Sequence, residues 1–191
     1  LSLSILILTL ANWQLASGQS ILTAQILSQW GVLNNQTELD LSNCGLMAIA
    51  PDTFISFTQL ETLRLDFNQL RLFSSDTFAP LINLRTLSLH GNPMKSIYPG
   101  TFKGLAQLET LYLSSTQLTS LLPQMFIDMP SLKYLYFKDS RISQVAETAF
   151  EGLGNIERLS LAGNEIESLE VATFHGMTKL KFLDLSQNRL T

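Results

Sequence analysis

The segment LETLRLDFNQL at residues 60–70 follows the pattern LxxLxLxxNxL, in which x is any residue. A weaker copy, QTELDLSNCGL, precedes it at residues 36–46, with Gln36 in place of the first aliphatic residue. A fixed period of this length predicts a stack of similar units, each of which buries its apolar face against its neighbours. The pattern or a close variant returns every 24 residues after residue 60, beginning at Leu84, Leu108, Leu132, Ile156 and Leu180.

A phenylalanine is locked to the same period, in the segment that leads from one copy to the next. We predict that these rings form a stacked spine in the convex half of the core, with adjacent rings in contact. Loss of one ring should cost about 3–5 kcal/mol. An aromatic ligand box is not favoured, because every copy carries the ring. The rings are Phe54, Phe78, Phe102, Phe126, Phe150 and Phe174.

Each copy also contains a short alternation of leucines, as in Leu63-Arg64-Leu65. A period of two indicates a strand whose leucines point inward and whose intervening residue faces solvent. Because each unit returns the chain to the same place one strand further along, successive strands must run parallel. The repeat therefore predicts a parallel sheet on one face of the stack and return segments on the other.

The N position of the pattern is small and polar, and we expect its side chains to bond backbone groups where the chain leaves each strand. Cys44 is the one cysteine of the chain, and it occupies this column. That position predicts a buried structural thiol rather than a reactive one. The column is Cys44, Asn68, Asn92, Thr116, Ser140, Asn164 and Asn188.

These motifs resemble the leucine-rich repeat family, in the 24-residue form typical of extracellular receptors, over residues 36–191. The resemblance implies an α/β solenoid of about seven repeats, a horseshoe with a concave parallel β-sheet and a convex side of loops and short helical turns. Similar proteins include Toll-type receptors, variable lymphocyte receptors and secreted insect immune proteins, which commonly serve innate immunity or cell adhesion. This chain differs from many of them in lacking a cysteine-clustered N-terminal cap.

The residues before the repeats suggest a secretory route. Residues 1–18 combine an apolar run with small residues near Gly18, which predicts most of a signal peptide; a buried apolar strand or helix is the alternative. Residues 19–35 are expected to cap the stack with an amphipathic helix that begins at Ser20 and ends near Gly31. The apolar face of this helix is expected to carry Leu22, Ile26, Trp30 and Leu33.

Asn35-Gln36-Thr37 is an N-glycosylation sequon, so we expect Asn35 to carry a glycan and the protein to be secreted or on the cell surface. Membrane attachment would come only through a segment outside this chain, and the sequence does not define an oligomeric state.

Composition limits the chemistry of the protein. The formal net charge is −4, which argues against nucleic acid as a partner because duplex binding needs a basic face. One cysteine and two histidines, His90 and His175, cannot supply a four-ligand zinc site. No catalytic triad, phosphate loop or acidic metal pair is present in the sequence. We therefore expect no enzyme activity, no cofactor and no metal.

Solvent-facing strand positions are the places where the repeats differ, so binding residues are expected there. Tyr112, Tyr134 and Tyr136 fall on adjacent strands, and rigid exposed tyrosines beside cations are typical of binding hot spots. Strand surfaces favour aromatic residues in any case, which is the structural alternative. A second candidate patch consists of Arg64, Asp66 and Phe67. The residues that surround the three tyrosines are His90, Lys138, Asp139 and Arg158.

One further column alternates in sign from repeat to repeat, and we expect it to form a ladder of weak exposed ion pairs along the sheet margin. The column is Glu61, Arg85, Glu109, Lys133, Glu157 and Lys181.

The sequence thus predicts an extracellular recognition module that binds a protein through its concave face, with innate immune recognition as its role. A microbial surface glycan or lipid is the alternative ligand. A cell-adhesion or developmental receptor ectodomain, or a structural scaffold that binds matrix, are the alternative roles.

Overall fold

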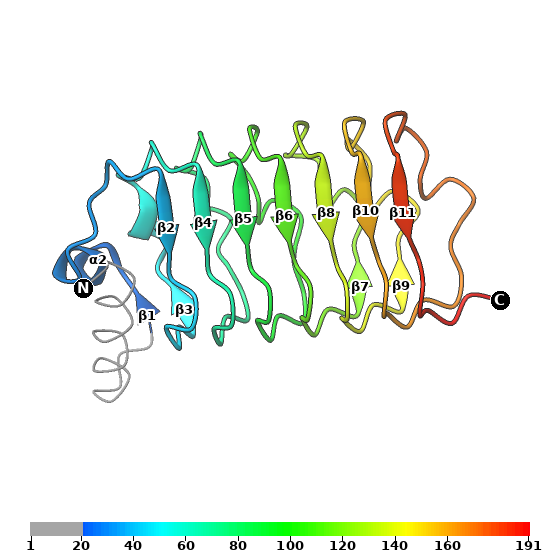
Figure 1. The fold of residues 1–191 in the computed structure, drawn as a ribbon, viewed down its shortest axis with the longest axis horizontal. Coiled ribbons are helices and arrows are strands. Elements are labelled where there is room, and N and C mark those ends of the chain that lie inside the picture. Colours follow the sequence, from blue (N-terminus) through cyan, green and yellow to red (C-terminus); the bar gives the residue numbers. More distant parts are fainter. Residues whose placement is uncertain (1–20) are drawn as a thin grey trace.

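The computed structural model describes residues 21–191, so the predicted signal peptide and Ser20 lie outside the described part. Seven short parallel strands stand in a row in the order of the chain and form one sheet (Figure 1). Every neighbouring pair is in register at the 24-residue period, as in the pairing of Leu63 with Leu87. The fold class is the predicted repeat solenoid. The strands are β2 (Glu38–Asp40), β4 (Thr62–Arg64), β5 (Thr86–Ser88), β6 (Thr110–Tyr112), β8 (Tyr134–Tyr136), β10 (Arg158–Ser160) and β11 (Phe182–Asp184).

Four further short strands lie outside the seven-stranded sheet in the described residues. The strand β1 (Ile21–Leu22) pairs with β3 (Ala48–Ile49), and β7 (Ser120–Leu121) pairs with β9 (Gln144–Val145), each pair parallel. A 3-10 turn, η1 (Pro51–Phe54), follows β3. Within residues 21–191, no helix has the length and apolar character needed to cross a bilayer.

The N-terminal helix differs from its prediction. The helix α2 (Ala24–Gln29) begins after Thr23, whose side-chain hydroxyl accepts a hydrogen bond from the Ile26 backbone N–H at 3.2 Å. Leu22 belongs to β1 instead, and its carbonyl accepts the Ala50 N–H at 2.9 Å. This strand pairing removes the first predicted turn and changes which residues face inward.

At the other end, Leu33 lies beyond the helix, which ends at Gln29, and it is 63% exposed rather than buried. Leu27, which the predicted helical face omitted, is buried with Leu22 and Trp30 in the core that continues into the repeats.

The phenylalanine spine is confirmed over most of its length. The rings from Phe78 to Phe174 stack one on the next with centroids 6.1–6.4 Å apart and planes within 20° of parallel. Phe54 departs from the stack, because its ring meets Phe57 edge-on at 6.0 Å. Phe174 is the one ring of the six that is only partly buried.

The small polar column also behaves as predicted. Asn164 shows the pattern: its amide N–H donates to the carbonyls of Phe137 and Leu161, each at 2.8 Å, and its amide oxygen accepts the Ile142 N–H at 3.1 Å. Thr116 and Ser140 replace the amide ladder by a hydroxyl contact of 2.9 Å. Cys44 is buried, and burial foremost, with the nearby Asp40 charge, raises the pKa of its thiol to about 12. A thiol with that pKa stays protonated and inert at neutral pH.

The residue before this column has a left-handed backbone conformation in every repeat. Glycine adopts it without strain at Gly91 and Gly163, but most other side chains do so at a cost. Phe67 is the bulkiest of them, with φ of +53°. The full set is Asn43, Phe67, Gly91, Ser115, Asp139, Gly163 and Gln187.

Candidate functional site

The solvent-facing side of the seven-stranded sheet, called the sheet face below, carries a pair of stacked tyrosines. Strand register places Tyr112 of β6 beside Tyr136 of β8, with ring centroids 5.0 Å apart and planes 7° from parallel. Tyr112 remains 38% exposed. The pKa of Tyr136 is raised, mainly by burial and secondly by the charge of the ionised Tyr112 beside it. The charge of Arg158 acts in the opposite direction.

A hollow of about 500 Å³ opens beside this pair. It arises because the next repeat has small residues at the end of β10 and just after it. Ser160 is 7% exposed and Ala162 is 2% exposed, so neither fills the space next to Tyr136 and Lys138. Larger side chains on both sides form its walls. The lining residues are His90, Tyr112, Ser114, Ser115, Tyr136, Lys138, Asp139, Arg158, Ser160, Phe182 and Asp184.

The charged groups of the hollow differ in how they are held. The guanidinium of Arg158 lies over the Phe182 ring, 4.2 Å from its centroid. Lys138 pairs with Asp139, with Nζ 3.8 Å from the carboxylate oxygen. Asp184 accepts hydrogen bonds from the backbone N–H and hydroxyl of Ser186, which together with Lys138 lower the pKa of its carboxyl group.

The structure brings together five of the predicted binding residues, His90, Tyr112, Tyr136, Lys138 and Arg158, in one hollow. Asp139, which was expected near them, also lines it. Tyr134 stands in register with Arg158 and Thr110 but does not line the hollow. Sequence reasoning left out five lining residues, Ser114, Ser115, Ser160, Phe182 and Asp184. The 24-residue period places Ser160 beside Tyr136, and the small size of Ser160 is the sequence signal that could have indicated a depression there.

The second predicted patch consists of residues outside the hollow, and two of its three side chains already contact other residues of the chain. The carboxylate of Asp66 accepts hydrogen bonds from the Ser88 hydroxyl and, at 2.9 Å, from the His90 backbone N–H. Asp66 therefore braces the neighbouring repeat. Phe67 meets the His90 ring edge-on at 4.8 Å and is 55% exposed. Arg64, at the end of β4, is also exposed.

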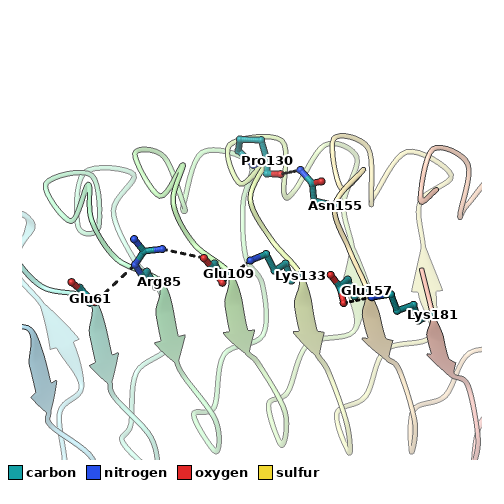
Figure 2. Close-up of polar contacts among 8 residues, drawn as sticks. All are labelled: Glu61, Arg85, Glu109, Pro130, Lys133, Asn155, Glu157 and Lys181. Atoms are coloured by element: carbon teal, nitrogen blue, oxygen red, sulfur yellow. Dashed lines mark hydrogen bonds and ion pairs between the residues drawn. The ribbon is translucent and has the colours of Figure 1, made fainter. Parts of the chain in front are cut away.

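The alternating charges form the predicted ladder at the sheet margin (Figure 2). Glu109 sits between Arg85 at 3.1 Å and Lys133 at 2.9 Å, and the hydrogen bond from Lys133 is the main reason that the pKa of Glu109 is lowered. Glu61 reaches Arg85 at 3.9 Å. Lys181 pairs with Glu157 at 2.8 Å, but no ion pair joins Lys133 to Glu157 in the described residues.

Metal-ligating side chains are not grouped in the described residues. No group of three or more histidine, cysteine, aspartate or glutamate side chains is placed to hold a metal ion there. The sheet face instead combines aromatic surface with hydrogen-bonding groups, an arrangement suited to recognition of another molecule.

Comparison with known proteins supports the class of the molecule. The family model described as "Leucine rich repeat" matches residues 35–94, 82–139 and 135–190, and the chain belongs to this family. Members of this family are typically binding modules rather than enzymes. Comparison with curated proteins gave no match.

Among solved structures, the chain is similar to TLR13 in its complex with the single-stranded RNA ssRNA13. The two are 30% identical with a TM-score of 0.84, and the match covers 90% of this chain and 24% of that chain. The chain thus spans about a quarter of the length of the TLR13 chain.

Proposed function

We propose that this chain is an extracellular recognition module that binds a protein partner through its sheet face, with the hollow as the centre of the contact, and that it serves innate immune recognition. The observation that carries the proposal is the stacked pair of Tyr112 and Tyr136 at the wall of the hollow. Within residues 21–191 neither tyrosine hydroxyl has a hydrogen-bond partner. The pair thus offers a rigid apolar body with polar tips, the combination typical of binding hot spots.

Placement outside the cytosol rests on the similarity to TLR13 and on Asn35, which is exposed and so accessible to a glycosyltransferase. The immune role rests on the same similarity and on the resemblance to other immune receptors. A cell-adhesion or developmental receptor ectodomain and a scaffold that binds matrix remain the alternative roles. A microbial surface glycan or lipid remains the alternative ligand.

Single-stranded RNA is a further candidate, because TLR13 is seen with one and because stacked aromatic rings can hold unpaired bases. The charges of the hollow favour a protein instead. Two carboxylates, Asp139 and Asp184, line it beside the cations Lys138 and Arg158, whereas a phosphate backbone requires a positively charged groove.

The proposal is tested with a partner found by screening the chain against displayed extracellular proteins. The double variant Tyr112→Ala with Tyr136→Ala should weaken binding by about 100-fold, as expected when two hot-spot residues are truncated. Tyr98→Ala is the matched control, because Tyr98 is an exposed tyrosine that does not line the hollow. Unchanged affinity of the double variant, or an equal loss with Tyr98→Ala, would place the contact elsewhere.

The cellular route has its own test. When the full-length protein is expressed in a secreting cell, Asn35→Gln should remove a glycan that a glycosidase also removes from the wild type. A wild-type protein with no glycan at Asn35 contradicts this part of the proposal.

A further inference from the structure

The hollow presents more hydrogen-bond donors than the protein itself uses. The inference drawn from them rests on the proposed function, because it names the chemistry of the partner group that enters the hollow.

Arg158 is the principal donor. A guanidinium carries five N–H groups, and within residues 21–191 the guanidinium of Arg158 makes no hydrogen bond and no ion pair. Its contact is with the face of the Phe182 ring, 4.2 Å from the centroid. A contact over the ring face leaves the guanidinium N–H groups available, and a guanidinium can bind a carboxylate through two parallel hydrogen bonds.

The acidic residues of the hollow do not meet this need. Asp139 pairs with Lys138, and Asp184 is held by both donors of Ser186 while Lys138 helps to lower its pKa. Among the described residues, only Asp139 forms an ion pair with Lys138, and neither carboxylate forms one with Arg158. Among the described residues, Arg158 is left as the cation of the hollow that has no carboxylate partner.

Hydroxyl groups add to the donor excess. Tyr136 and Ser160 line the hollow beside Arg158, and neither side-chain hydroxyl has a hydrogen-bond partner in residues 21–191. The rings of Tyr112 and Tyr136 supply apolar surface beside these donors. A group that suits the hollow therefore needs acceptor oxygens at its tip and a short apolar stem.

We propose that the hollow receives an aspartate or glutamate side chain of a protein partner, whose carboxylate takes a two-point hydrogen bond from the guanidinium of Arg158 beside the tyrosine pair. Charge complementarity to Arg158, which has no carboxylate partner among the described residues, favours an acidic residue over a neutral or basic one.

The test uses a displayed library of random peptides, selected in parallel on the wild-type chain, on Arg158→Gln and on Arg71→Gln. Arg71 is an exposed arginine that does not line the hollow, so it controls for the loss of one positive charge. Peptides selected on the wild type and on Arg71→Gln should be enriched in aspartate and glutamate over the starting library, and those selected on Arg158→Gln should not.

The best acidic peptide is then synthesised with its key residue as glutamate and as glutamine. Changing either the peptide glutamate to glutamine or Arg158 to glutamine should weaken binding about 10- to 100-fold. Making both changes together should weaken it little further, because the two groups act on one another.

The outcomes separate the two proposals. Peptides that need Tyr112 and Tyr136 but bind Arg158→Gln as well as the wild type would refute the acidic-residue proposal and leave the binding hollow standing. Peptides that are insensitive to both sets of substitutions would refute both. A selection without acidic enrichment, or binding of a uridine-rich single-stranded RNA that depends on Arg158 where acidic peptides fail, also overturns the inference.

Discussion

Two stacks of aromatic rings lie on opposite sides of the same repeats. The buried stack runs through five repeats from Phe78 to Phe174 with centroids 6.1–6.4 Å apart. The surface stack consists of Tyr112 and Tyr136 alone, 5.0 Å apart, because Ser88 and Ser160 occupy the same strand position in the repeats on either side. A feature that every repeat shares supports the fold, whereas a feature confined to two repeats is free to carry specificity.

The largest expected effect lies in the buried stack. Phe126→Ala removes a fully buried ring that contacts Phe102, Phe137 and Phe150, and it should lower the free energy of unfolding by about 3–5 kcal/mol. Tyr112→Ala should lower it by less than about 1 kcal/mol, because its ring is partly exposed. Denaturant titration of both variants measures the difference. Similar losses would mean that the tyrosine pair is also part of the scaffold.

The next effect concerns the amide ladder between the two stacks. Asn164→Leu would leave the Ile142 N–H and the Phe137 carbonyl without a partner, whereas the Leu161 carbonyl keeps the Asn188 amide, and the cost should be about 2–3 kcal/mol. Asn155→Leu is the control, since its exposed amide donates to the Pro130 carbonyl at 2.9 Å (Figure 2) and its loss should cost less than about 1 kcal/mol. The same denaturant titration distinguishes them. Equal costs would show that burial adds nothing to this hydrogen bonding.

A smaller effect is expected on the pKa of Tyr136 in the surface stack. Burial and Tyr112 raise the pKa of Tyr136, so its phenol should titrate above the ordinary value of about 10. The raised pKa means that this group stabilises the fold at lower pH, and the contribution is lost as pH rises through the folded-state pKa. Tyr112→Phe should move the pKa of Tyr136 part of the way back, because it removes the charge but keeps the ring. Ring carbon shifts followed by NMR test this, and a lower pKa than for an ordinary tyrosine contradicts it.

The smallest effect belongs to the charge ladder, which is shared by the repeats but exposed. Hydrogen bonding to Lys133 lowers the pKa of Glu109, so its contribution to stability is present above the unfolded-state pKa of about 4.3 and is lost as pH falls through the folded-state pKa. Glu109→Gln should therefore be slightly less stable than the wild type at neutral pH, and the difference should vanish in acid. Thermal unfolding across that pH range is the measurement. A difference that persists in acid would have another cause than charge.

The repeat made most of the scaffold predictable from sequence. The 24-residue period alone determines that Leu63 pairs with Leu87 and that Tyr112 lies beside Tyr136. Both pairings can be predicted without a structure, because parallel units of equal length keep their register.

The features that the sequence did not predict have two causes. Some depend on how far individual side chains extend, and others depend on which backbone segments pair with one another. The 24-residue period places Ser160 level with Tyr136, but the depth of the hollow depends on the positions of the neighbouring side chains. The hydrogen bonds that the Asp66 carboxylate accepts from the Ser88 hydroxyl and the His90 N–H could be recognised only from atomic positions. The N-terminal helix was misjudged because a helical pattern does not show that the β3 backbone competes for Leu22.

The alternating ladder also bears on how such a chain can change its length. Removing one whole repeat would keep every leucine in register yet set Glu61 against Glu109, like charge against like (Figure 2). Removing two adjacent repeats would instead restore an acid next to a base. The alternation of charge along the sheet margin thus survives only when an even number of repeats is added or removed. We therefore expect duplication of repeats in pairs to disturb these ion pairs least.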